Sequence, residues 1–307
     1  TGILPMLKET AQGRTRTIVE RINPYLSPAK IDYEADVLPL APNGNPTERH
    51  VCIAYDNKAR DIFPDENARA AYWADKLGAD ADGLRAMFID PPVFQALIRS
   101  KVMKAGGVGY VKPEGPDFPA FKDVTRFFLN AGAIPTFAWL DGTSAGEQNI
   151  DEMLDLMMAE GVAFVNIIPD RNWNIKDPDT RKQKVALLHD FVQRALDRHL
   201  PIMVGTELNA YGQRYVDDFS VEEMQPLVAP ALDAAMILHG HTVLESTQGM
   251  GYVSEWAKVR FASAQEKNAF YRRIGETVAP GKTKATELLG PEMSPHHVLA
   301  TLQSANA

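Results

Sequence analysis

Three charged residues lie just after apolar runs of the sequence, where a strand that enters a loop would place them. Asp141, Arg171 and Glu207 each follow such a run within a few residues. A carboxylate in this position can act as a general base or bind a metal, and an arginine can hold a phosphate or carboxylate with two parallel hydrogen bonds. These residues form the candidate catalytic set. The alternative is structural, with Glu207 in an ordinary ion pair with Arg171 or Arg214.

A pair of histidines follows a fourth apolar run. His239 and His241 are two residues apart, and side chains with that spacing face the same side of a strand. Together with Glu207 they would supply nitrogen and oxygen ligands to a divalent ion, so the expected cofactor is zinc, manganese or iron. The alternative is that each imidazole only hydrogen-bonds backbone carbonyls at the end of the strand.

Neighbouring aromatic and polar residues are candidates for binding a substrate. Trp139 can serve as an aromatic platform for a sugar ring, and Asp170 and Asn209 lie beside members of the catalytic set. The alternatives are that Trp139 fills the core and that the polar residues are turn formers and helix caps.

Short apolar runs alternate with amphipathic segments over the middle of the chain. Such alternation, with short connections, is typical of parallel strands covered by helices. It predicts an α/β fold, a (β/α) barrel whose chemistry lies at the carboxyl ends of its strands. Apolar periodicity and apolar runs predict these elements: helices at 149–160, 178–199 and 221–231, and strands at 134–139, 163–168, 201–205 and 234–238.

The two ends of the chain lack this alternation. We expect a helix over 4–22, and two strands at 32–40 and 49–55 joined by a turn that contains Asn-Gly. Helical pieces broken by glycine and proline follow over 65–105. The expected domains are a barrel at 1–245, with 65–105 as an inserted helical segment, and a helical appendage at 246–307.

Several of these segments resemble the PHP family (polymerase and histidinol phosphatase), whose members are distorted seven-stranded barrels that hold up to three metal ions. Residues 129–139, LNAGAIPTFAW, look like the family's AGGIPVLAHP strand. Residues 161–166, GVAFVN, resemble its GIDGIEV strand, and 201–209, PIMVGTELN, are similar to its final G-S-D-x-H motif. The match covers about 30–245 and implies a TIM-like barrel with metal-dependent chemistry.

The resemblance also adds residues to the expected metal site and shows departures from the family pattern. It implies that Glu34 and His50, on the expected hairpin, lie near the other ligands. Trp139 stands where the family has a histidine, and Glu207 stands where it has an aspartate. The family's D-x-H-x-H motif does not occur before residue 30, which implies that the chain lacks the first strands of the barrel.

Three functions follow as hypotheses. The leading one is a PHP-like metal-dependent hydrolase, of the phosphoesterase type, that acts on a small anionic or sugar-like substrate. The first alternative is a metal-dependent sugar isomerase or epimerase, in which Glu207 would pair with a second acidic ligand such as Asp170 or Glu245. The second alternative is a catalytically degenerate barrel that serves as a binding or subunit-contact module.

Composition narrows the class of partner. The 32 Lys and Arg residues against 40 Asp and Glu residues give a net charge of −8, so the chain as a whole lacks the basic footprint of a nucleic-acid binder. No run reaches the ~20 uninterrupted apolar residues of a membrane span, so we expect no membrane contact.

The expected partners are a small-molecule substrate and further copies of the chain, in a homo-oligomer that covers the strand edges. Cys52 is the one cysteine, and we expect a cytoplasmic protein, with a removed signal peptide as the alternative.

Overall fold

The computed structural model describes residues 2–112, 118–208 and 213–306. The chain divides into two compact units, Thr1–Ala120 (unit 1) and Phe121–Ala307 (unit 2). Helices account for 64% of the residues and strands for 4%. The predicted distorted seven-stranded, TIM-like barrel is therefore wrong, because the described residues form one three-stranded sheet and the other three segments expected to be strands are helical. The division into units falls at Ala120, whereas the sequence pattern suggested a boundary at 245.

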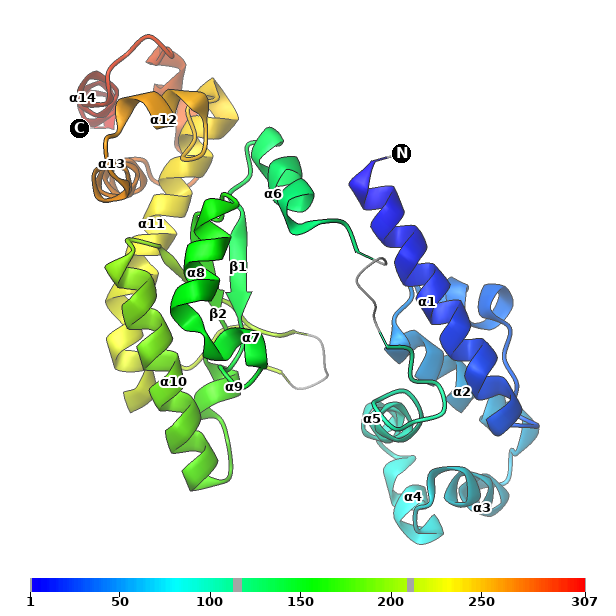
Figure 1. Ribbon diagram of the computed structural model, residues 1–307. Helices are drawn as coiled ribbons and strands as arrows, with labels where there is room; N and C mark the ends of the chain where they lie inside the picture. The colour runs from blue at the N-terminus through cyan, green and yellow to red at the C-terminus, as the bar shows by residue number, and fades with distance from the viewer. Residues whose placement is uncertain (1, 113–117, 209–212, 307) are drawn as a thin grey trace. The chain divides into compact units, whose positions relative to one another are not determined.

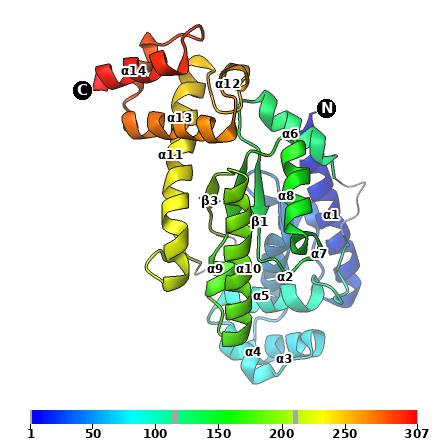
Figure 2. The ribbon, with the colours of Figure 1, turned by 60° about the vertical axis from the view of Figure 1, so that its left-hand side comes forward.

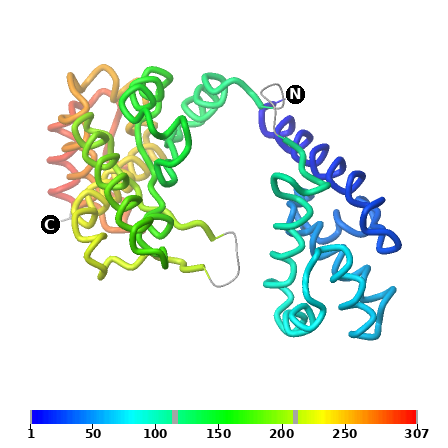
Figure 3. Tube along the Cα trace, turned by 60° about the horizontal axis from the view of Figure 1, so that its bottom comes forward, coloured from blue at the N-terminus to red at the C-terminus, as the bar shows by residue number. Residues whose placement is uncertain are grey.

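Unit 1 is built from helices packed around one apolar core (Figures 1 and 3, blue to cyan). Ile18 and Ile22 of the first helix, Tyr55 of the second and Trp73 and Phe94 of later helices are almost fully buried there. The elements of unit 1 are α1 (Ile3–Tyr25), the π-helix η1 (Tyr33–Val37), the 3-10 helix η2 (Leu38–Leu40), α2 (Glu48–Ile62), α3 (Glu66–Leu77), α4 (Ala81–Met87) and α5 (Pro91–Val102).

The predicted hairpin in unit 1 is wrong, because its second strand is part of α2. The buried residues Val51, Cys52, Tyr55 and Ala59 recur at the spacing of one helix face. Thr47 caps the helix, since its side chain and that of His50 form a reciprocal capping box with the backbone. A short apolar run such as VCIAY fits a strand or a buried helix turn equally well, so its pattern alone could not decide.

Unit 2 contains one three-stranded parallel sheet in its described residues. The strands are β1 (Thr136–Trp139), β2 (Phe164–Ile167) and β3 (Ile202–Val204), in the order β1-β2-β3. Thr136 is in register with Phe164, and Val165 with Ile202. Three of the four predicted strands are confirmed, and their parallel direction places all three carboxyl ends at the same edge.

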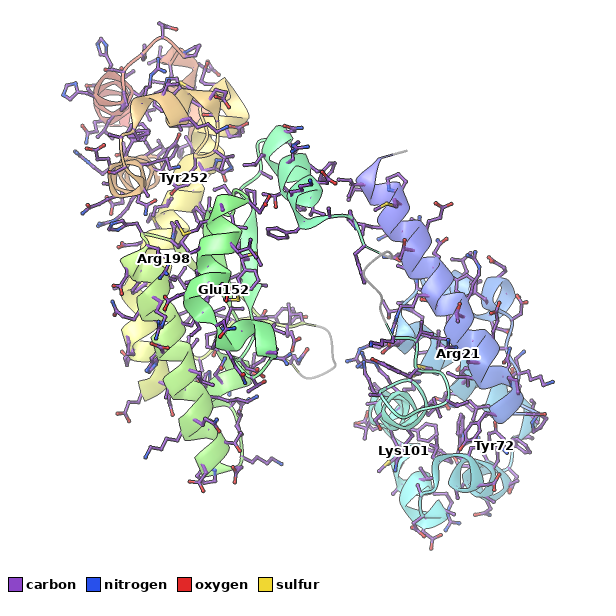
Figure 4. The ribbon with its side chains drawn as sticks, viewed as in Figure 1. Arg21, Tyr72, Lys101, Glu152, Arg198 and Tyr252 are labelled. Carbon is purple, nitrogen blue, oxygen red and sulfur yellow. The ribbon has the colours of Figure 1, made fainter. Side chains whose placement is uncertain are left out.

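Helices α8 (Ile150–Ala159) and α10 (Pro178–Asp197) connect the strands and pack against one face of the sheet (Figure 2). Arg198, labelled in Figure 4, follows α10 and forms ion pairs with Asp151 at 3.0 Å and Asp155 at 2.8 Å, both on α8. The remaining elements are α6 (Phe121–Asn130), α7 (Ala145–Gln148), α8 (Ile150–Ala159), α9 (Asp170–Trp173), α10 (Pro178–Asp197), the 3-10 helix η4 (Glu222–Met224), α11 (Gln225–Gln248), α12 (Glu255–Arg260), α13 (Ala264–Thr277), the 3-10 helix η5 (Thr283–Leu288) and α14 (Pro295–Asn306).

The fourth predicted strand, 234–238, is wrong, because it forms the middle of α11. A Cβ added to Gly240 would lie 2.0 Å from the Tyr271 carbonyl oxygen, and one added to Gly275 would lie 2.0 Å from the Met236 carbonyl oxygen. The two glycines therefore let α11 and α13 pack backbone against backbone. Helix α11 also runs without a break through the expected domain boundary at 245.

The segment Glu222–Gln248 is long and apolar enough to cross a membrane by length and composition. These two properties do not distinguish a membrane span from the core helix of a soluble domain. In unit 2, Ile237, Val243 and Leu244 of this segment are buried in one apolar cluster with residues of α13.

Candidate functional site

Four charged side chains meet at the carboxyl edge of the sheet in unit 2. Arg171, on α9 after β2, places Nη1 2.8 Å from Glu207 Oε1 after β3 and Nη2 4.0 Å from Asp141 Oδ2 after β1. Lys184 of α10 places Nζ 2.8 Å from the same Asp141 oxygen. We call these four residues the sheet-edge cluster. The two cations and two carboxylates balance one another, and the cluster joins the ends of all three strands.

Asp141 is held as a carboxylate. Its residue is only 8% exposed, and burial alone would raise its pKa. Hydrogen bonds from Lys184 and from the side chain and backbone of Thr143 outweigh burial, so the pKa of Asp141 lies below its usual range. Asp141 is therefore ionised at neutral pH, and it accepts hydrogen bonds rather than donating them.

The loop after β1 fixes the position of Asp141. The Leu140 backbone N–H donates to Glu147 Oε1 over 2.7 Å, and the Ser144 hydroxyl donates to Glu147 Oε2 over 3.0 Å. Gly142 has a φ of +74°, a conformation that a residue with a Cβ rarely adopts. The loop thus has a defined shape before any ligand binds, which is the arrangement that accurate binding requires.

A buried aspartate fixes the loop after β2. Asp217 is 5% exposed and accepts hydrogen bonds from the Asp170 backbone N–H at 2.9 Å and from the Trp173 indole N–H at 2.8 Å. It also accepts the Asp218 backbone N–H at 2.7 Å. Because Asp217 comes from the segment after β3, it ties that segment to the helix that carries Arg171.

A buried asparagine links the first two strand ends. Asn172 is fully buried, and its amide N–H groups donate to the Leu140 carbonyl at 3.1 Å and the Ile168 carbonyl at 3.3 Å. Within the described ranges its amide oxygen has no hydrogen-bond partner. An unpaired buried acceptor costs about 1–3 kcal/mol and is uncommon in folded proteins. This unpaired amide oxygen belongs to the residue next to Arg171, so it lies at the same edge of the sheet as the cluster.

The two histidines lie on α11, so the strand geometry on which their pairing depended is wrong. Each residue of a helix is rotated by about 100° from the one before it, so side chains two residues apart point to nearly opposite sides. His239 Nε2 lies 2.7 Å from the Val278 carbonyl, and His241 Nδ1 accepts the Tyr252 backbone N–H at 2.9 Å. Burial lowers the pKa of His241 below its usual value, and the nearby Glu245 carboxylate only partly opposes this.

The two metal ligands expected from the family resemblance belong to unit 1. Glu34 forms an ion pair with Arg16 at 2.7 Å. His50 Nδ1 accepts the Thr47 backbone N–H at 2.9 Å as part of the cap of α2. In the part of the chain that the structure describes, no group of three or more His, Cys, Asp or Glu residues could hold a metal ion.

The three residues expected to bind substrate do not lie together in the described structure. Trp139 is fully buried and stacks on Phe191 with ring centroids 4.6 Å apart, so it fills the core between β1 and α10. Asp170 begins α9, and its carboxylate accepts the Asn174 side-chain N–H at 3.0 Å. Asn209 lies outside the described residues.

Some residues of the site were not found from the sequence. Lys184 is one of several lysines and arginines on α10, and no spacing in the sequence singles it out; Asn172 has the residue type of a turn former. Asp217 lies in a loop with several other charged and aromatic residues, and the contact that marks it is with Trp173, which is distant in sequence. The sequence carried a signal only for Asp141, Arg171 and Glu207, namely their positions after apolar runs.

Comparison of the chain with protein-family models, with curated proteins and with solved structures gave no match. The resemblance to PHP proteins therefore stays a prediction.

Proposed function

We propose that unit 2 binds a small anionic or sugar-like molecule at the sheet-edge cluster and hydrolyses it. The observation that supports this most is the meeting of Asp141, Arg171 and Glu207, which come from three separate strand ends. In open α/β sheets, ligands bind outside the carboxyl ends of the strands. Side chains that meet there from separate loops form a place where several polar groups of one ligand can be contacted together.

Arg171 is the anion-binding group in this proposal. Its side chain is 34% exposed and that of Glu207 is 30% exposed, so a ligand can reach both. A guanidinium carries five N–H donors, and a phosphate or carboxylate can take two of them in parallel. Such a ligand would compete for Arg171 and release the Glu207 carboxylate from its present hydrogen bond.

Glu207 is the general base in this proposal. Once released, its carboxylate can take a proton from a water molecule that attacks the ester or glycosidic bond of the substrate. That bond breaks, the phosphoryl or glycosyl fragment gains the hydroxyl of the water, and Glu207 passes the proton to the departing alcohol. Lys184 and Thr143 hold Asp141 ionised, and its carboxylate would accept a hydrogen bond from a hydroxyl of the substrate.

A resident metal does not fit this site as the structure describes it. Asp141 and Glu207 provide hard oxygen donors, but the described residues offer no third ligand beside them. Both carboxylates are instead bound to cations. No step of the proposal passes through a metal.

Binding and turnover can be tested separately. The binding probes are inorganic phosphate and citrate, measured by calorimetry on the wild type, on Arg171→Gln and on the control Arg181→Gln, which pairs with Glu223. The turnover probes are p-nitrophenyl phosphate and p-nitrophenyl glucoside, with Glu207→Gln. We expect Arg171→Gln to lose the anion binding that the sheet-edge cluster contributes, Arg181→Gln to keep it, and Glu207→Gln to lose at least about 100-fold in turnover. Absence of binding and turnover with every probe would contradict the proposal.

A binding or subunit-contact module is the second candidate, and one observation favours it. An apolar cavity of about 530 Å³ lies between the edge strand β3 and α11, with Met203, Phe219 and Leu232 among its lining residues. Leu232 is 58% exposed there. Light scattering would test the second-copy form of this function: a dimer that Leu232→Glu converts to a monomer supports it, and a monomeric wild type contradicts it.

A further inference from the structure

Three cations converge on one buried carboxylate in unit 1. Glu48, the first residue of α2, is 9% exposed. Its Oε1 lies 3.0 Å from Arg14 Nη2 of α1. Its Oε2 lies 2.8 Å from Arg99 Nε of α5 and 3.0 Å from Lys104 Nζ, in the turn after α5. We call these four residues the Glu48 cluster.

The cluster has more positive than negative charge. Burial alone would raise the pKa of Glu48, but hydrogen bonds from Lys104, Arg14 and Arg99 outweigh it, so the pKa is lowered and the carboxylate is ionised. Three positive groups against one negative group leave an excess of two positive charges. The cation side chains are 32%, 31% and 48% exposed, so each one also reaches solvent.

A purely structural role explains only part of this arrangement. A carboxylate at the start of a helix is favoured by the helix dipole, which accounts for Glu48 itself. One cation would balance it and tie two helices together, whereas each further cation adds repulsion between like charges. Each arginine has five N–H donors: Arg14 uses Nη2 on Glu48 and on the Val111 carbonyl, and Arg99 uses Nε on Glu48. Lys104 uses one of its three donors. Donors are therefore left that can bind a second anion.

We propose that unit 1 binds a phosphate group at the Glu48 cluster, held by Arg14, Arg99 and Lys104. A phosphate carries close to two negative charges at neutral pH and would balance the excess of the cluster. Its oxygens accept several N–H donors at once, as guanidinium groups that approach from different helices require. This site is separate from the sheet-edge cluster, and its existence does not depend on the function proposed for unit 2.

A charge-matched pair of variants tests the site in the full chain. Lys104→Gln removes a cation of the cluster, and Lys101→Gln removes an exposed lysine of α5 (labelled in Figure 4) that is not among the cations bound to Glu48. The probe is inorganic phosphate, measured by calorimetry at low salt. We expect the dissociation constant to rise about tenfold in Lys104→Gln, the size of one charge-assisted hydrogen bond, and to stay unchanged in Lys101→Gln. No phosphate binding by the wild type, or an equal loss in both variants, would overturn the proposal.

Glu48→Gln provides a test with the opposite sign. This variant removes the carboxylate that competes with phosphate for the three cations. Phosphate should therefore bind more tightly than in the wild type and should raise the melting temperature more. A cluster with only a structural role predicts a lower melting temperature that phosphate does not restore, and that result would overturn the proposal. If Glu48→Gln does not fold, the comparison of Lys104→Gln with Lys101→Gln still tests whether phosphate binds at the Glu48 cluster.

The source of the phosphate is distinguished by a second probe. Phosphoserine and inorganic phosphate share the phosphate group, and only phosphoserine carries an organic substituent. Tighter binding of phosphoserine would indicate a phosphorylated organic molecule, and tighter binding of inorganic phosphate would indicate the free ion. Binding of either probe that depends on Lys104 supports the site, and binding that is independent of Lys104 contradicts it.

Discussion

Arg171 donates a hydrogen bond from Nη1 to Glu207 Oε1 over 2.8 Å, and this bond joins the end of β2 to the end of β3. The bond is accessible to ligands, because both side chains are about one-third exposed. Ion pairs at this exposure contribute about 0–1 kcal/mol to stability, so the pair adds little to the folded state. An anionic ligand can therefore replace Glu207 as the partner of Arg171 without a large cost in stability.

Replacement of Arg171 should separate binding from stability. We expect Arg171→Gln to shift the free energy of unfolding by less than about 1 kcal/mol, as for other partly exposed pairs. The same variant should lose the stabilisation that citrate gives to the wild type. Thermal melts with and without citrate provide the measurement, with Arg181→Gln as the control. Loss of several kcal/mol without citrate would show that Arg171 is a structural residue.

The lowered pKa of Asp141 predicts a loss of stability in acid. Its ordinary value is 3.8, and Lys184 and Thr143 hold the folded-state pKa below that. The stabilisation from the ionised carboxylate is present above pH 3.8 and disappears as the pH falls through the folded-state pKa. The difference in unfolding free energy between wild type and Asp141→Asn should therefore be constant near neutral pH and shrink below about pH 4. Urea unfolding at several pH values would measure it, and a constant difference down to pH 2.5 would contradict the assignment.

The sequence predicts the central part of unit 2 correctly for a physical reason. The runs at 134–139, 163–168 and 201–205 are short and mostly apolar, as strands of a parallel sheet usually are, and helical periodicity separates them. Because parallel strands end at the same edge, the positions of Asp141 and Arg171 after their strands also predicted that these residues would meet.

The errors arise where a short apolar run is compatible with two structures. Residues 234–238 fit a strand, but Gly240 lets α11 approach the Tyr271 carbonyl of α13, and this contact between distant segments favours a helix. The run around Tyr55 is likewise a helix because its buried residues face the core of unit 1. Lys184 was missed for a related reason: its bond to Asp141 joins residues that are 43 positions apart.

Close packing between α11 and α13 predicts a large effect of a single methyl group. In Gly240→Ala the new Cβ would lie 2.0 Å from the Tyr271 carbonyl oxygen, so the two helix backbones must move apart. We expect a loss of about 1–3 kcal/mol or more in the free energy of unfolding. Gly146→Ala is the control, because no atom lies within 4 Å of its added Cβ, and alanine should stabilise that helical position slightly. Equal stability of the two variants in urea would contradict the close packing.

His241 predicts a second pH dependence, at a higher pH than Asp141. Burial lowers its folded-state pKa below the ordinary value of 6.5, so the folded protein binds the proton less readily than the unfolded chain. Its contribution to stability is therefore complete above pH 6.5 and is lost as the pH falls through the folded-state pKa. The neutral ring also accepts the Tyr252 backbone N–H at Nδ1, a bond that protonation of that nitrogen would break.

The measurement is the slope of unfolding free energy against pH between about pH 7 and 5, the range in which a histidine of the unfolded chain gains its proton. His241→Asn removes the titrating group and should flatten the slope, although the variant is less stable at pH 7. His296→Asn changes an exposed histidine of α14 and should keep the slope of the wild type. If His296→Asn flattens the slope and His241→Asn does not, the pH dependence arises outside the contact between α11 and the turn at Tyr252.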